Sequence, residues 1–126
     1  MASPTDRRYS ESHEWHKLDG DILTLGLTRF AIDELTDITY VELKPVGTTI
    51  SAGEEVGEVE SVKATSDVYS SIGGEIVEVN ESLDEDPSVL NSDPYEGGWL
   101  VRLRVGDAGG MDSLMDGASY DQKHPS

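Results

Sequence analysis

The sequence predicts a mainly β protein made of short antiparallel strands, with a few short helices between them. Two features of its 126 residues indicate this fold class. Apolar residues alternate with polar ones, or form short runs rich in Val, Ile and Thr, as in half-buried strands. Gly, Pro, Asn and Asp recur between these segments, where tight turns are expected. The length fits one domain of ordinary size.

About seven or more strands are expected, and six of them are clear from their β-branched residues. Glycines mark most of the breaks between them. The six clearest strands cover residues 22–27, 38–43, 54–61, 67–71, 74–80 and 99–105.

Three segments are predicted to be helical. Thr28 is a plausible N-cap for a helix over residues 29–36, in which apolar residues share one face. A short helical turn is expected around residues 87–90. The last helix is expected over residues 111–120, because Met111, Leu114, Met115 and Ala118 follow the i, i+3, i+4, i+7 pattern.

The ends of the chain carry no clear pattern. Residues 1–8 and 121–126 are expected to be disordered tails on either side of one domain formed by residues 9–120.

Charge and composition exclude several classes of function. The formal net charge is −17, so phosphate backbones and anionic lipid surfaces are repelled by the molecule as a whole. No apolar stretch approaches the length that spans a bilayer. No cysteine is present, which excludes a thiolate nucleophile and fits a reducing compartment. We therefore expect a soluble monomer that binds neither nucleic acid nor membrane.

No catalytic or metal site can be assembled from the sequence. The histidines are His13, His16 and His124, and the last lies in a predicted tail. His13 and His16 are three residues apart, but no third ligand has a convincing spacing, and a structural histidine is the simpler reading. We expect neither catalytic residues nor a metal ion.

Lys63 is the residue with the most unusual place. It is one of only four lysines and lies at a turn between two segments that are predicted to be antiparallel strands. This geometry presents its amine at a hairpin tip. The acidic residues around it favour the charged ammonium, so an enzyme would have to modify it. Judged by its position alone, Lys63 could instead be a turn residue that only contributes to solubility.

The surrounding sequence resembles the lipoylation segment of the H protein family of the glycine cleavage system. The resemblance covers about residues 9–120 and is carried by several blocks in the same order. These blocks are Gly57-Glu58-Val59-Glu60-Ser61-Val62-Lys63-Ala64-Thr65-Ser66-Asp67-Val68, Ser12-His13-Glu14-Trp15, Gly26-Leu27-Thr28, Tyr40-Val41-Glu42-Leu43, Pro94-Tyr95 and Gly97-Gly98-Trp99.

The resemblance implies a hybrid barrel-sandwich, like that of lipoyl domains, built from two antiparallel sheets with short flanking helices, one of them C-terminal. It also implies that Lys63 carries lipoate in amide linkage. The protein would then be a non-catalytic carrier in glycine catabolism and one-carbon metabolism. Its partners would be the pyridoxal-phosphate glycine decarboxylase, the tetrahydrofolate-dependent aminomethyltransferase, dihydrolipoyl dehydrogenase, and a lipoate ligase or a lipoyl or octanoyl transferase.

The resemblance further assigns three residues to a cleft that holds the loaded lipoyl arm. Ser12, Glu14 and Asp67 match family positions with this role. Glu14 could pair with the ammonium of the aminomethyl group, while Ser12 forms a hydrogen bond. The alternative for Glu14 is membership of an N-terminal strand anchored by Trp15.

One departure from the family lies before the second predicted strand. Thr36-Asp37 stands where the family usually has glycine followed by an acidic residue. Because this change touches a helix end, it bears on the fit to partners and not on lipoylation.

Two other functions remain open. An H-like protein could serve in lipoate relay or in lipoate-linked sulfur oxidation, and an unmodified acidic interaction domain would use the same fold without the cofactor. The expected location is the bacterial cytoplasm, or the mitochondrial matrix if a transit peptide has been removed.

Overall fold

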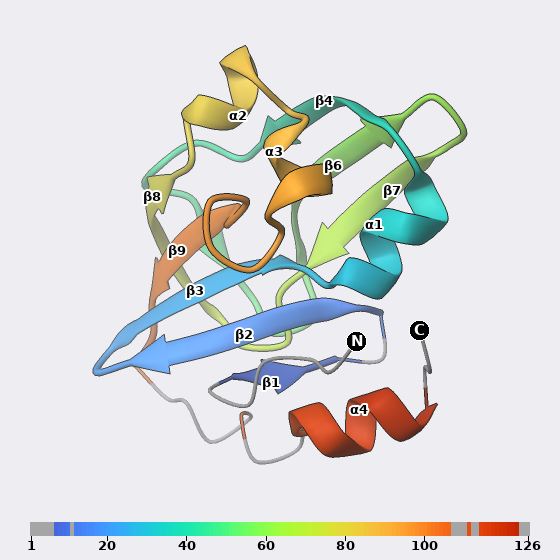
Figure 1. Ribbon diagram of the computed structural model, residues 1–126. Coiled ribbons are helices and arrows are strands. Elements are labelled where there is room, and N and C mark those ends of the chain that lie inside the picture. The colour runs from blue at the N-terminus through green and yellow to red at the C-terminus, as the bar shows by residue number, and fades with distance from the viewer. Residues whose placement is uncertain (1–6, 11, 107–110, 112–113, 124–126) are drawn as a thin grey trace.

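The computed structural model describes residues 7–10, 12–106, 111 and 114–123 (Figure 1). These residues form nine strands and four helices. In chain order they are β1 (Arg8–Tyr9), β2 (Glu14–Asp19), β3 (Ile22–Leu27), α1 (Arg29–Leu35), β4 (Ile38–Leu43), β5 (Thr49–Ile50), β6 (Glu55–Ser61), β7 (Thr65–Tyr69), β8 (Gly74–Val79), α2 (Ser82–Glu85), α3 (Val89–Ser92), β9 (Val101–Arg104) and α4 (Gly117–Lys123).

The strands form two antiparallel sheets, as the sequence predicts. The larger sheet has six strands in the order β1-β2-β3-β9-β8-β5, and the smaller one has the order β4-β6-β7. Most strands that pair in a sheet are also close in sequence. The exception is β3, which pairs with β9 far along the chain. In the described part of the chain, no helix is both long and apolar enough to cross a bilayer.

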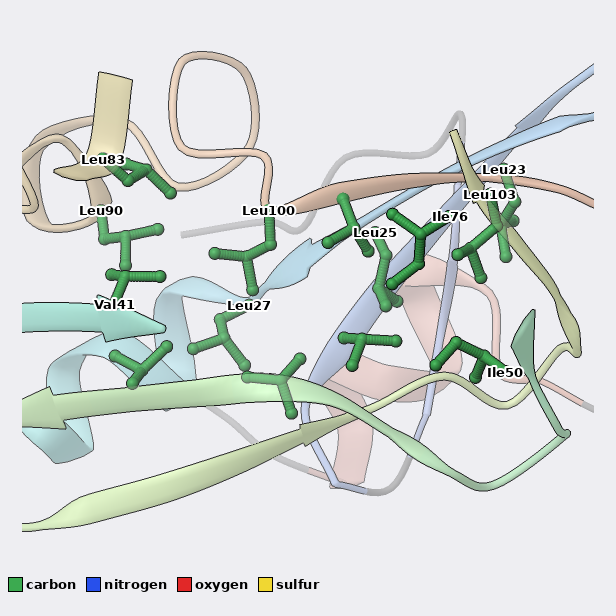
Figure 2. Close-up of a cluster of buried hydrophobic side chains, with 14 of the residues drawn as sticks. Leu23, Leu25, Leu27, Val41, Ile50, Ile76, Leu83, Leu90, Leu100 and Leu103 are labelled. Atoms are coloured by element: carbon green, nitrogen blue, oxygen red, sulfur yellow. The ribbon is translucent and has the colours of Figure 1, made fainter. Parts of the chain in front are cut away.

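The core lies between the two sheets. Leu23, Leu25 and Leu27 of β3 face it from the large sheet, and Val41 faces it from the small sheet (Figure 2). The alternation of apolar and polar residues within these strands therefore buries one face of each sheet. Leu83 and Leu90 of the short helices cap one end of this core.

A second, aromatic cluster attaches the N-terminal strands and the C-terminal helix to the large sheet. Tyr9, Trp15 and Tyr120 are fully buried together, and the rings of Tyr9 and Tyr120 stack at 4.9 Å. The Trp15 ring lies on Gly26, its partner in the β2–β3 register. A Cβ at Gly26 would come within 2.6 Å of that ring, so only glycine fits there.

Several predicted elements are confirmed. The strands over residues 22–27 and 38–43 have the predicted bounds, and α1 begins after Thr28, whose hydroxyl accepts a hydrogen bond from the Ala31 amide. The strand predicted over residues 67–71 lies earlier, at Thr65–Tyr69, because pairing with β6 starts directly after the turn.

The helical predictions near the C-terminus were confirmed only in part. The short turn expected around residues 87–90 is present as α3, two residues later, whereas α2 before it was not predicted. The predicted helix over residues 111–120 was wrong in its bounds: Met115 instead bridges to Tyr9, and α4 begins at Gly117 and continues to Lys123, into a predicted tail. Residues 112–113 of that prediction lie outside the described residues. The Asp116 side chain caps α4 by accepting from the Ser119 amide.

The two sheets are joined by side chains of β2 that accept hydrogen bonds from the backbone at the end of β7. Glu14 Oε2 accepts from the Tyr69 amide at 3.2 Å, and His16 Nε2 accepts from the Ser71 amide at 3.1 Å. Two polar side chains therefore take the place of strand pairing at this junction. Because Nε2 of His16 is an acceptor, its Nδ1 carries the proton, and Nδ1 has no hydrogen-bond partner among the described residues.

Burial lowers the pKa of His16 to about 4, against a smaller opposing contribution from the nearby Glu14 carbonyl. We predict that His16 makes the free energy of unfolding fall as the pH is lowered from about 6.5 to about 4. In that window the unfolded chain binds a proton at residue 16 and the folded protein does not. The loss attributable to this group is about 3 kcal/mol. Urea unfolding between pH 7 and pH 4.5 measures it.

The control for this prediction is the His16→Gln variant, whose amide oxygen can still accept from Ser71. Its unfolding free energy should depend less on pH than that of the unchanged protein. Equal slopes for the two proteins would contradict the assignment.

Thr36 ends α1 in a conformation that normally requires glycine. Its φ is 67° and its ψ is −136°, a region that a β-branched residue enters only with strain. We predict that Thr36→Gly raises the free energy of unfolding by about 1 kcal/mol. The relief of backbone strain in the folded state should outweigh the conformational entropy that glycine adds to the unfolded chain. Denaturant titration checks this. Thr65→Gly, in the regular strand β7, should lower stability instead.

Candidate functional site

The β6–β7 hairpin ends in a short turn whose backbone is fixed by one serine. The Ser61 hydroxyl accepts from the amides of Lys63 and Ala64 at 3.1 and 3.0 Å, and the Ser61 amide donates to the Ala64 carbonyl. The Val62 amide donates to the Asp37 carbonyl, which ties the turn to the segment after α1. The turn is thus held at a defined position beside α1 (Figure 1).

Lys63 occupies this turn, as predicted, and its side chain is exposed. Its Nζ donates to the Glu34 carbonyl near the C-terminal end of α1 at 3.2 Å. Helix C-termini carry partial negative charge and favour such a cation. The amine is accessible to another protein and is held by a single, exposed hydrogen bond, so little would have to be broken to modify it.

A cavity of about 350 Å³ opens between α1, β7 and the turn that precedes β2. Its apolar wall is formed mainly by Leu27, Phe30 and Leu35. Its polar lining is formed by Ser12, His13, Glu34 and Ser66. Glu34 both lines the cavity and holds Lys63 through its carbonyl, so the lysine lies beside the cavity.

A buried carboxylate is connected to this cavity through Ser12. Glu14 is fully buried and accepts from the hydroxyls of Ser10 and Ser12 at 2.6 and 2.5 Å, besides the Tyr69 amide. Burial raises the pKa of Glu14, and these hydrogen bonds partly oppose the rise. Ser12 both lines the cavity and donates to this carboxylate, so its hydroxyl connects the two.

Asp67 lies elsewhere. It is exposed on the face of β7 opposite Val68, pairs in register with Glu58, and accepts from the Tyr69 hydroxyl at 3.3 Å. Its neighbour Ser66 is the residue of β7 that lines the cavity. The structure therefore brings Ser12 and Glu14 together and places Lys63 next to Glu34, which lines the same cavity as Ser12, whereas Asp67 does not line the cavity.

His13 is a lining residue that the sequence did not single out for this role. It has a positive φ of 72°, its ring packs at a tilt against Phe30 with centroids 4.6 Å apart, and its Nδ1 contacts the Tyr120 hydroxyl at 2.8 Å. Burial raises the pKa of Tyr120 to about 12, so this hydroxyl stays protonated. The spacing of Phe30 and Glu34, one helical turn apart, was the available signal for the α1 wall.

No group of three or more metal-ligating side chains occurs in the parts of the chain that the structure describes. His13 and His16 point to different partners, Tyr120 and Ser71 respectively.

The chain is similar to known proteins along nearly its whole length. A family model described as "Glycine cleavage H-protein" matches residues 7–125. The glycine cleavage system H protein of Alcanivorax borkumensis is 48% identical over 117 residues, covering 93% of this chain and 91% of that protein. The mitochondrial glycine cleavage system H protein 2 of Arabidopsis thaliana is 50% identical, covering 93% of this chain and 75% of that protein.

A solved structure extends the likeness to the fold. The crystal structure of a glycine cleavage system H protein from Mycobacterium marinum matches with a TM-score of 0.85 and 38% identity, covering 96% of this chain and 98% of that one. The two-sheet architecture, the hairpin lysine and these matches along nearly the whole sequence lead to one conclusion: the chain belongs to the glycine cleavage H-protein family.

Proposed function

We propose that Lys63 carries a lipoyl group in amide linkage and that the chain is the lipoyl carrier of a glycine cleavage system. Membership of the H-protein family supports the carrier role. The observation that carries the proposal is an exposed amine on a fixed turn, next to a cavity that is connected through Ser12 to a buried carboxylate. Such a turn gives an arm a fixed base, and such a cavity can receive a cationic group.

The proposed cycle involves three enzymes. The lipoyl group would accept the aminomethyl group of glycine at the pyridoxal-phosphate decarboxylase, with release of carbon dioxide. It would give the methylene to tetrahydrofolate at the aminomethyltransferase, with release of ammonia, and be reoxidised at dihydrolipoyl dehydrogenase. The two sulfurs supply the thiol chemistry that a chain without cysteine lacks.

The dimensions suit this role. A lysine side chain joined to an eight-carbon acyl chain reaches roughly 12 to 15 Å, enough to enter an active site while the domain stays outside. Tethering holds the reactive group at an effective concentration on the order of millimolar at a docked partner. The chain itself supplies position and shelter, and we propose no catalytic residue in it.

The cavity is proposed to shelter the loaded end of the arm. An aminomethyl group bound to sulfur loses its amine readily in water, and the apolar wall of Leu27, Phe30 and Leu35 would limit access of water. The ammonium would be attracted by Glu14 through the Ser12 hydroxyl. Its charge would also lower the pKa of Glu14 and keep that carboxylate ionised.

For Asp67 we propose a weaker role in holding the arm. Its carboxylate lies on the outer face of β7 and could act on the arm only outside the cavity. The relatives come from bacteria and from a mitochondrion, which supports a location in a bacterial cytoplasm or a mitochondrial matrix. We propose that the carrier works as a monomer.

One prediction from the proposed function concerns the attachment site. Incubation with a lipoate ligase, lipoate and ATP should add one lipoyl increment to the intact mass. Lys63→Arg should abolish it, because guanidinium does not form the amide. The matched control is Lys17→Arg, in β2 of the large sheet, which should still gain the increment. An increment that survives in Lys63→Arg would overturn the assignment of this lysine.

Another prediction from the proposed function concerns the buried carboxylate. In Glu14→Gln, the loaded arm should lose its amine about tenfold faster, since a charged hydrogen bond is replaced by a neutral one. Ammonia release from the loaded protein, without the aminomethyltransferase, measures this rate. Asp67→Asn should change the rate little. An unchanged rate in Glu14→Gln, with lipoylation and stability intact, would remove Glu14 from the proposed site.

A further inference from the structure

The small sheet has one face on the core and one face exposed. Val41, Val59 and Val68 point inward and are buried. The outward residues alternate with them along the three strands. We call this surface the outer face of the small sheet. Its residues are Tyr40, Glu42, Glu55, Glu58, Glu60, Thr65, Asp67 and Tyr69.

Three carboxylates form a row across this outer face. Glu42 pairs in register with Glu58, and Glu58 pairs with Asp67. With strands about 4.8 Å apart, the row is about 10 Å long. Partial burial and the neighbouring carboxylates raise the pKa of Glu58. Like charges side by side oppose folding, so this row is an arrangement that packing alone would not favour.

Two exposed aromatic rings accompany the row. Tyr40 is 50% exposed and Tyr69 is 39% exposed, and they are two of the four large exposed hydrophobic residues in the described part of the chain. Tyrosine is enriched where proteins bind one another, because its ring is apolar and its hydroxyl is polar.

A groove adjoins one end of the row. It has a volume of about 260 Å³, and Glu42, Glu55 and Glu58 provide its carboxylates. Leu43, Lys44, Pro45 and Gly57 complete the lining, and Lys44 is paired with Glu54. An apolar wall with carboxylates at its edge fits the stem and head of an arginine or lysine side chain.

The outer face continues to the tip that carries Lys63. Glu58 lies five residues before Lys63, which corresponds to about 16 Å along an extended strand. An ordinary interface patch of about 800 Å² per partner has about this radius. A protein centred near the row would therefore reach the turn with the edge of its interface, while the Lys63 amine bonds to the Glu34 carbonyl on the α1 side of the hairpin.

An enzyme that acylates Lys63 has to come closer than any other partner. Acylation joins Nζ to the acyl carbon, expels the activating group of the donor and releases protons from the amine. The active site must therefore meet the hairpin itself. Enzymes that act on the far end of a finished arm can remain roughly 12 to 15 Å away.

We propose that the outer face of the small sheet is the docking surface for the enzyme that acylates Lys63, and that this enzyme presents a basic surface with one arginine or lysine side chain in the groove. The inference rests on the proposed function only in that Lys63 is acylated. It assigns the recognition to Glu42 and Glu58 with the flanking tyrosines.

The test measures lipoylation kinetics with a lipoate ligase, lipoate and ATP. The double variant Glu42→Gln with Glu58→Gln should raise KM for the carrier about tenfold, with little change in kcat, and weaken the dependence of kcat/KM on salt. The matched control is Glu75→Gln with Glu81→Gln, which removes the same charge from exposed positions on and after β8. It should behave as the unchanged protein.

Stability separates a docking role from a structural one. Removing like charges from the row should leave the unfolding free energy equal or higher, while KM still rises. A double variant that matches the control in KM, or that loses kcat alone, would overturn the proposal. A rise in KM for the glycine decarboxylase with no change in lipoylation would also overturn it. Failure of the unchanged protein to accept lipoate would instead refute the proposed function.

Discussion

The contact between β2 and the end of β7 is the interaction on which the site depends. Glu14 and His16 project from β2 of the large sheet. They accept hydrogen bonds from the amides of Tyr69 and Ser71, at the end of the hairpin away from Lys63. These bonds fix where the end of the hairpin meets the large sheet. They therefore fix the direction of the Lys63 turn and hold the Glu14 carboxylate against Ser12 of the cavity in a single arrangement.

The same strand is held from its other side by aromatic packing. The Trp15 ring lies on Gly26 and donates through its indole to the Pro94 carbonyl at 3.0 Å, while the guanidinium of Arg7 covers the ring at 4.6 Å. Alternate residues of β2 thus make polar bonds to one sheet and apolar contacts to a second cluster. The buried carboxylate and the buried histidine are tolerated because both accept hydrogen bonds from backbone amides.

Much of the fold could be predicted from the sequence, since β3, β4 and α1 combine regular apolar spacing with clear breaks and a threonine cap. β2 was less clear because its buried residues include Glu14 and His16, which interrupt the usual alternation. The face of β7 on which Asp67 lies depends on its register with β6, which sequence spacing does not determine. At the C-terminus, Met115 fits the apolar spacing of a helix but forms a β-bridge with Tyr9 instead. The helix was therefore predicted to begin too early.

The turn around Lys63 has a consequence for the thermodynamics of docking. Ser61 and Asp37 already hold its backbone in place before any partner is bound. When a proposed lipoyl arm enters an active site, the conformational entropy that is lost belongs to the arm and not to the hairpin. A carrier that must visit several enzymes in turn can then bind each one weakly, and leave it quickly, without ordering its own backbone at every visit.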